Sequence, residues 1–218
     1  MQIRSTSQCN TPTSFKALKI ANIKTSLGNK TASIDLYQLR REDYAFLQKL
    51  DKKINFENTS DKLSEFHKKR WEKVFKYCLE AAFDHWNITY IAVSKNKPCG
   101  IMTFQNLRNV FLDGICAIPD KNGNKTPFSG KSLLYELFKV AKDTESKEIS
   151  LNAVPDGTFN PVKIYEDLGF KRNATQDSEY IEMSCNKYNI KEQLKNFAKD
   201  MVYTPYGGEK VHLDEVID

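Results

Sequence analysis

The feature that most restricts the fold is a change of hydrophobic period between residues 109 and 154. The segment 109–119 reads as a strand, and a polar loop then leads to KSLLYELFKVAKD, in which the apolar side chains follow a helical spacing. Residues 147–154 alternate again, with Ile149, Leu151 and Ala153 on one side. Strand, helix and strand in this order form a crossover, so the two strands are parallel neighbours if they pair directly.

The segments around the crossover predict further strands and helices. Strands are expected at 31–39, 87–94, 99–107, 170–173 and 179–185, and helices at about 40–53, 61–86, 159–167 and 189–201. The strands at 87–94, 99–107 and 109–119 follow one another closely enough to form an antiparallel meander. The sequence therefore predicts a mixed sheet with one parallel pair.

The two ends of the chain differ from the middle in composition. Residues 1–30 carry five basic residues and no acid, which accounts for the formal net charge of +5. We expect residues 1–30 to be a flexible basic segment, and residues 202–218 to be a mostly irregular tail. A basic leader on a neutral body is a weak indication of nucleic-acid binding, which requires a folded basic face.

Composition excludes several classes of protein. The chain of 218 residues has no apolar run long enough to span a membrane and no secretory signal. Its five cysteines are widely spaced without a CxxC pair, so neither a disulfide framework nor a metal site is expected. Free thiols in a reducing compartment, the cytoplasm, are the favoured interpretation.

The loop that ends in Phe-Ser-Gly-Lys-Ser, residues 128–132, joins a strand to the start of a helix. The free N–H groups and positive dipole of a helix N-terminus can bind a diphosphate, and Gly130 would allow close approach. Ser129, Lys131 and Ser132 could add donors. An ordinary helix capped by Ser129 explains the same residues, and the Gly123–Gly130 spacing is wrong for a Walker loop.

Four stretches together resemble the GNAT superfamily of N-acetyltransferases. They are 36–50, 115–142, 149–154 and 164–171, and the last, IYEDLGFK, is similar to the common Tyr-Glu-x-Leu-Gly-Phe signature of the family. The resemblance implies a GNAT-like domain at 31–185, followed by a C-terminal helix and tail at 186–218. It also implies an α/β (α+β) fold, with a mixed, mostly antiparallel sheet of six to seven strands, helices on both faces and a splayed parallel strand pair.

The resemblance further implies acetyl-CoA as donor, an amine as acceptor and no metal. In the family the pantetheine lies between the two parallel strands, so backbone groups at Cys116, Ala117 and Ile118 would hold it. Ser129, Gly130, Lys131 and Ser132 would hold the phosphates, with Asn152 on the facing strand. The loop departs from the family pattern at Pro127 and Ser132 and is longer than usual, so we expect a reshaped phosphate site.

Two residues are candidates for proton transfer. Tyr165 matches the family tyrosine that protonates the departing thiolate, although a tyrosine packed on the sheet is the alternative. Asp113 lies four residues before Ala117, so period-two alternation predicts that both face the same side, where Asp113 could act as base. A bulge aspartate beside Gly114 is an equally good interpretation, and Cys116 is expected to be a buried apolar side chain.

The sequence thus predicts an acetyl-CoA-dependent N-acetyltransferase that acts on a primary amine by direct attack in a ternary complex. The alternative is a non-catalytic acyl-CoA-binding or partner-binding module with the same fold, and an RNA-associated protein is a weaker third interpretation. The acceptor, a small molecule or a protein amine, is not identified. The tail after residue 186 is a candidate for covering the acceptor site or for contact within a homodimer.

Overall fold

A computed structural model describes residues 16–40, 43–54, 64–120, 122–155, 159–173, 179–213 and 217. The strands are β1 (Ala17–Leu27), β2 (Lys30–Gln38), β3 (Ile88–Ser94), β4 (Lys97–Asn106), β5 (Val110–Ala117), β6 (Glu148–Ala153), β7 (Lys171–Arg172), β8 (Ile181–Asn186) and β9 (Met201–Val211). The helices are α1 (Tyr44–Lys53), α2 (Glu65–Ala82), α3 (Ser129–Asp143), α4 (Pro161–Asp167) and α5 (Lys187–Asp200). No helix in these ranges is long and apolar enough to cross a membrane.

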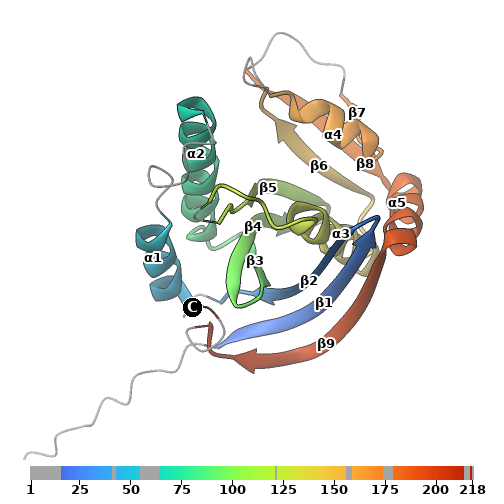
Figure 1. Ribbon diagram of the computed structural model, residues 1–218. Helices are drawn as coiled ribbons and strands as arrows, with labels where there is room; N and C mark the ends of the chain where they lie inside the picture. Colours follow the sequence, from blue (N-terminus) through green and yellow to red (C-terminus); the bar gives the residue numbers. More distant parts are fainter. Residues whose placement is uncertain are drawn as a thin grey trace, which may run out of the picture.

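All the strands form one sheet in the order β7-β8-β6-β5-β4-β3-β2-β1-β9 (Figure 1). Neighbouring strands are antiparallel except β5 and β6, which are parallel as the crossover through α3 requires. The predicted mixed, mostly antiparallel sheet is confirmed. It has nine strands rather than six to seven, because β1 and β9 were not expected.

The two additional strands correct the predictions for the chain ends. β1 lies inside the segment expected to be flexible, so that prediction is wrong for residues 17–27, while residues 1–15 lie outside the described residues. β9 replaces the irregular tail expected after residue 202. Pro205 and two glycines are uncommon inside strands, so the sequence pattern did not predict β9. In the structure these residues lie at the sheet edge, next to a register shift opposite Ile20.

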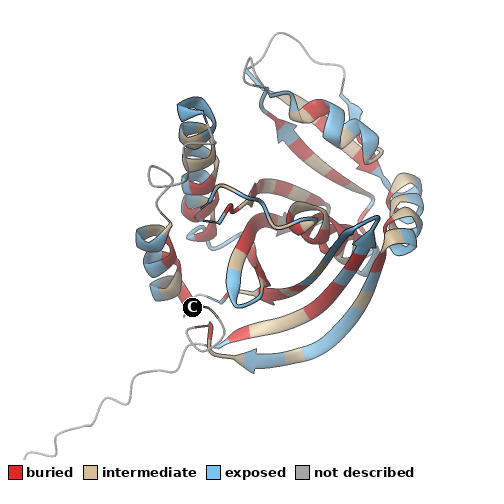
Figure 2. Cartoon of the chain, viewed as in Figure 1, coloured by how far each residue is buried: buried red, intermediate tan, exposed pale blue. Residues whose placement is uncertain are grey.

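Helices cover both faces of the sheet and close two hydrophobic cores (Figure 2). We call them the α3-side core, to which α3, α4 and α5 contribute, and the α2-side core, to which α1 and α2 contribute. Phe138 of α3 packs edge-to-face on Phe170 and Phe197 in the first. Phe75 of α2 and Leu47 of α1 are buried in the second. Each buried aromatic or leucine side chain contributes about 1.5–3 kcal/mol relative to exposure.

β9 is joined to the helix that follows the crossover loop. The hydroxyl of Tyr203 donates to Oε2 of Glu136 on α3 at 2.7 Å, and Glu136 is buried. Burial raises the pKa of Glu136, while the hydrogen bond from Tyr203 opposes that rise. The edge strand is therefore anchored to α3 by a buried polar contact as well as by the β1–β9 ladder.

Candidate functional site

The parallel pair β5–β6 is joined for only three residue pairs, Val110–Ile149, Phe111–Ser150 and Leu112–Leu151. Beyond these pairs β5 continues through residues 113–117 without a partner on the β6 side. We call these unpaired ends of β5 and β6 the fork. In Figure 1, β6, β8 and α4 lean away from β5 and α2. The predicted splay of the parallel strands is present, and it begins at Asp113.

A bulge in β5 lies at the base of the fork. Phe104 of β4 pairs with Leu112 and Thr103 pairs with Gly114, so Asp113 has no partner of its own in β4. Before the bulge, Leu112 belongs to the α3-side core, whereas after it Cys116 belongs to the α2-side core. The alternation is thus reversed, and both Asp113 and Gly114 face α2.

This reversal corrects the expectation that Asp113 and Ala117 share a face. Ala117 pairs with Gly100, and a Cβ atom on Gly100 would meet Leu133 of α3 at 2.9 Å. Ala117 therefore faces the α3 side, while Asp113 contacts α2. The Asp-Gly pair is a weak indication of a bulge, and the two-residue period alone cannot predict the reversal.

At every second residue of β5, the backbone N–H and C=O groups point into the fork. The amide of Ile118 donates to the carbonyl of Cys99 on β4 at 3.0 Å. In an antiparallel ladder such bonds recur at every second residue, so Cys116 also pairs with β4, and the backbones of Ile115 and Ala117 face the fork. Of the three residues whose backbone was predicted to hold the pantetheine, only Ala117 has its backbone directed into the fork, and that of Ile115, which was not predicted, is directed there as well.

Asp113 is held by two hydrogen bonds. The hydroxyl of Tyr77 on α2 donates to Oδ1 at 2.6 Å, and Nδ2 of Asn87 donates to Oδ2 at 2.9 Å. Burial and the bond to Asp113 raise the pKa of Tyr77, so Tyr77 remains a donor. Both carboxylate oxygens accept a hydrogen bond, so Asp113 positions α2 as well as being a candidate base.

Gly114 allows α2 to approach the bulge closely. A Cβ atom there would lie 2.9 Å from Sγ of Cys78 and 3.1 Å from Oγ1 of Thr103. Both distances are shorter than normal van der Waals contact, so glycine is required unless α2 moves.

Tyr165 lies on α4, whose N-terminus is capped by Asn160 with Pro161 at the first position. Its ring packs on Phe170 in the α3-side core. Burial, and to a lesser extent the nearby thiol of Cys78 on α2, raises the pKa of Tyr165 to about 12. The hydroxyl of Tyr165 has no hydrogen-bond partner among the described residues.

The N-terminus of α3 lacks a side-chain cap. The residue before it, Phe128, has φ of 65°, a left-handed conformation that is uncommon for a bulky residue. The amide of Ser132 donates to the carbonyl of Phe128, whereas within the described part of the chain the amides of Gly130 and Lys131 have no partner. A Cβ on Gly130 would meet no atom within 4 Å, so there is open space beside these amides.

The residues predicted to bind phosphate in this loop have different environments in the structure. The chain turns at Phe128 rather than at Gly130, and Ser129 begins the helix instead of capping it. Ser132 is fully buried, with its amide bonded to Phe128, so neither of its groups is available to a phosphate. Nζ of Lys131 lies 3.3 Å from Oδ2 of Asp200 at the end of α5. The two free amides are therefore the main donors at this helix start.

Two other predicted site residues, Cys116 and Asn152, also differ in their environment. Cys116 is buried, and burial raises the pKa of its thiol to about 12, as expected for an inert apolar side chain. Asn152 is exposed on β6 between Leu151 and Ala153, which both belong to the α3-side core, so Asn152 faces the α2 side. No three His, Cys, Asp or Glu side chains gather in the ranges that the structure covers.

Two cations on the α2 side were not predicted as site residues. The guanidinium of Arg70 stacks 3.6 Å from the ring centre of Phe159, just before α4. Nζ of Lys125 lies 4.6 Å from the ring centre of Trp71, so the loop before α3 contacts α2. No local pattern predicts these contacts, because they join three segments that are distant along the chain.

Comparison with known proteins bears on the fold. No family model matches the sequence, and no curated protein matches it significantly. The structure of apo FdhC, described as a nucleotide-linked sugar GNAT, aligns with a TM-score of 0.52 at 14% identity, covering 84% of this chain and 97% of that one. An aminoglycoside 6'-N-acetyltransferase complexed with coenzyme A aligns at 0.48, with 14% identity over 69% and 96% of the two chains. The GNAT domain of S. lividans PAT aligns at 0.47, with 10% identity over 71% and 90%. With its forked parallel pair in a mostly antiparallel sheet, the protein has the fold of the GNAT N-acetyltransferases.

Proposed function

We propose that this protein is an acetyl-CoA-dependent N-acetyltransferase that transfers an acetyl group to a primary amine. The observation that carries the proposal is the fork, which opens at Asp113, and the loop after β5 leads to two free amides at the start of α3. A thioester arm requires a slot with unpaired backbone groups, and its diphosphate requires N–H donors. The unpaired backbone of β5 and the free amides of α3, which the loop 118–128 connects, support this assignment.

The cofactor is assigned to backbone groups rather than charged side chains. The amides of Gly130 and Lys131 would bind the diphosphate, and the open space beside Gly130 leaves room for it. The backbones of Ile115 and Ala117 would bind the pantetheine as an added strand. An amide of β5 would also polarise the thioester carbonyl.

The reaction is a direct displacement. The lone pair of the neutral amine attacks the thioester carbon, the C–N bond forms, and collapse of the tetrahedral intermediate breaks the C–S bond. The thiolate leaves beside Tyr165, whose hydroxyl donates a hydrogen bond and then the proton. The proton lost by the amine passes to Asp113 directly or through water. Because the pKa of Tyr165 is raised to about 12, the phenol stays protonated near neutral pH.

One observation favours the alternative of a non-catalytic acyl-CoA-binding module. Both oxygens of Asp113 already accept hydrogen bonds from Tyr77 and Asn87, as expected of a structural carboxylate. In that case the fork would bind acyl-CoA without a base to activate the amine. Both candidate functions require binding of acyl-CoA, but only the N-acetyltransferase would transfer the acetyl group.

The experiment has two stages that separate these candidates. Calorimetry with acetyl-CoA and the full chain should give saturable binding, and a panel of primary amines should then release free CoA thiol in the presence of at least one member. Binding without thiol release from any amine supports the non-catalytic module. An absence of binding at millimolar acetyl-CoA contradicts both.

A further inference from the structure

Tyr77 carries a hydroxyl at the base of the fork that has no part in the reaction proposed for Tyr165 and Asp113. The ring of Tyr77 lies against the bulge, because a Cβ atom on Gly114 would be 3.3 Å from Cδ1 of Tyr77. From there the hydroxyl donates to Oδ1 of Asp113 at 2.6 Å. Tyr77 is nevertheless 49% exposed. The hydroxyl is thus fixed at the point where β5 and β6 separate, on a side chain that is open to solvent.

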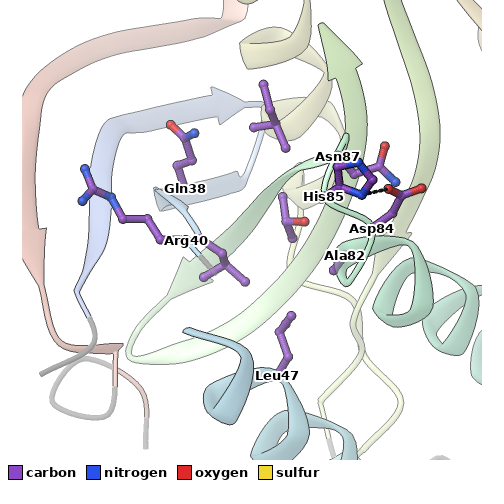
Figure 3. Close-up of a pocket in the computed structure, with 10 residues that line it drawn as sticks. Gln38, Arg40, Leu47, Ala82, Asp84, His85 and Asn87 are labelled. Atoms are coloured by element: carbon purple, nitrogen blue, oxygen red, sulfur yellow. Dashed lines mark ion pairs between the residues drawn. The ribbon is translucent and has the colours of Figure 1, made fainter. Parts of the chain in front are cut away.

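The two hydrogen bonds to Asp113 differ in their surroundings. The bond from Tyr77 is exposed to solvent, whereas the bond from Asn87 is partly buried. Nδ2 of Asn87 also donates to the carbonyl of Ala81 at 2.8 Å, so both of its protons are used. Asn87 lines a separate pocket between the ends of β2 and α2 and the start of β3 (Figure 3), which neither Tyr77 nor Asp113 lines. The Tyr77 side of Asp113 is therefore the side open to a substrate, and Asn87 holds the other side.

The two donors also differ in their chemistry. The amide nitrogen of Asn87 is a donor only, whereas a phenol that donates its one proton still has lone pairs on the same oxygen. The hydroxyl of Tyr77 can thus accept a hydrogen bond from a second group while it donates to Asp113. A hydroxyl in this position can pass a proton from the second group to the carboxylate and end in its original state.

The ionisable groups that face Asp113 from α2 are Tyr77 and Cys78, and its other contact, Asn87, is neutral. Burial, followed by the hydrogen bond and the charge of Asp113, raises the pKa of Tyr77. Burial also raises the pKa of Cys78 well above its ordinary value, with smaller contributions from Cys116 and Asp113. Tyr77 and Cys78 are therefore neutral at neutral pH, and Asp113 is the member of this set that can hold the proton of an ammonium ion.

We propose that Tyr77 is a catalytic residue that contacts the acceptor amine and relays its proton to Asp113, an inference that rests on the proposed acetyl transfer at the fork. The hydroxyl oxygen of Tyr77 accepts a hydrogen bond from the acceptor ammonium. One N–H bond of the ammonium breaks as an O–H bond forms on Tyr77, and the former O–H bond of Tyr77 breaks as its proton moves to Oδ1 of Asp113. The amine becomes neutral, with a lone pair for attack, and Asp113 becomes a carboxylic acid that later gives the proton to water.

The relay explains how Asp113 can serve as the base although both of its oxygens accept hydrogen bonds from the protein. It also generates the neutral amine at the site, so the reaction does not depend on the small neutral fraction of the amine in solution. The acceptor would then lie on the α2 side of the fork, where Tyr77 is exposed.

The test compares Tyr77→Phe with the wild-type full chain in the thiol-release assay. The substrates are acetyl-CoA and the amine that the wild type acetylates fastest in a panel of primary alkylamines, which includes propylamine and ethanolamine. The wild type uses the ammonium ion, so its kcat/KM for the amine should hardly change between pH 7 and pH 9. Tyr77→Phe can use only the neutral amine, whose fraction rises about tenfold per pH unit below the pKa of an alkylamine. We expect kcat/KM of the variant to be about 10²-fold lower at pH 7 and to approach that of the wild type near pH 9.

Three controls separate a proton relay from a structural contact. Tyr206→Phe removes a phenol that is 38% exposed on β9, and it should leave kcat/KM unchanged at every pH. Asp113→Asn removes the proton acceptor, so adding Tyr77→Phe to it should lower kcat/KM no further at pH 7. The affinity of Tyr77→Phe for acetyl-CoA, measured by calorimetry, should equal that of the wild type if the fork is intact.

The possible outcomes distinguish the relay from the acetyl transfer on which it rests. If the wild type releases thiol and Tyr77→Phe shows no deficit, or the same deficit at every pH, the relay is overturned and the proposed function stands. Loss of acetyl-CoA binding in Tyr77→Phe would assign the hydroxyl to folding and would likewise overturn the relay. If the wild type binds acetyl-CoA but releases thiol with no amine, the proposed function is overturned together with the relay.

Discussion

Strand pairing is nearly continuous along β1, on one side of the sheet, and is interrupted between β5 and β6, on the other. β1 pairs with β2 and β9 along almost its whole length, and β9 is also anchored through Tyr203 and Glu136. β5 and β6 share three residue pairs and then separate at a bulge. Register shifts occur on both sides, but among the described strands the one in β5 is followed by unpaired backbone and lies in close contact with α2. The continuous ladders on the β1–β9 side stabilise the sheet, whereas the fork leaves backbone groups unpaired, as the proposed cofactor site requires.

The largest effect is expected from Gly114→Ala at the base of the fork. The added Cβ would lie 2.9 Å from Sγ of Cys78, so α2 must move away from β5. We expect the free energy of unfolding to fall by about 1–3 kcal/mol and acetyl transfer to fall further than in any other variant considered below. Urea unfolding and the thiol-release assay would measure both.

The matched control is Gly207→Ala on β9, where a Cβ would meet no atom within 4 Å. This variant should keep both its stability and its turnover. Equal losses in the two variants would show that the fork is no more constrained than the edge strand.

Tyr165→Phe should affect turnover alone. Removing the phenol leaves the departing thiolate without its donor, so kcat should fall by about 10²-fold or more while affinity for acetyl-CoA stays unchanged. The raised pKa, about 12, further predicts that ionisation of Tyr165 causes no loss of activity between pH 7 and pH 10. Steady-state kinetics across this range would check both statements.

Tyr188→Phe is the control for this change, since Tyr188 is 85% exposed on α5. An unchanged kcat in Tyr165→Phe, in a protein that does transfer acetyl groups, would assign Tyr165 to packing on Phe170.

Tyr203→Phe on the paired side should affect stability alone. It leaves the buried carboxylate of Glu136 without its donor, which should lower the free energy of unfolding by about 1–3 kcal/mol at pH 7. The pKa of Glu136 is already raised, and loss of the donor raises it further. The carboxylate therefore protonates more readily as pH falls, and the loss of stability should be smaller at pH 5. A loss that is equal at both pH values would exclude this explanation.

The smallest effect is expected from Lys163→Ala on α4. Nζ of Lys163 lies 3.8 Å from Oδ1 of Asp167, and both side chains are largely exposed. Such pairs contribute about 0–1 kcal/mol, so thermal unfolding and turnover should hardly change. A change in turnover alone would indicate that the surface of α4 takes part in the reaction.

Local periodicity predicted the crossover and most helices and strands well, because each has a clear apolar face. It failed for β1, whose alternation is interrupted by a register shift after Lys19, and for β9, whose Pro205 and glycines resemble a loop. In both cases stability comes from pairing with a distant segment rather than from a local pattern.

The site was only partly predictable for a related reason. Tyr165 and the loop before α3 are marked by local motifs. The reversal at Asp113, the left-handed Phe128 and the contacts of Arg70 and Lys125 depend on packing between remote elements. The direction of a backbone group has no sequence signature, so the strand register was needed to show that the backbone of Ile115, and not that of Cys116, faces the fork.

The most direct test of the fork is an amide NMR titration of the full chain with coenzyme A. If the arm of the cofactor lies between β5 and β6, the signals of Ile115, Ala117, Gly130 and Lys131 will move together and saturate, while those of β1 and β9 will stay in place. Saturable binding that leaves those four amides unperturbed would contradict the account.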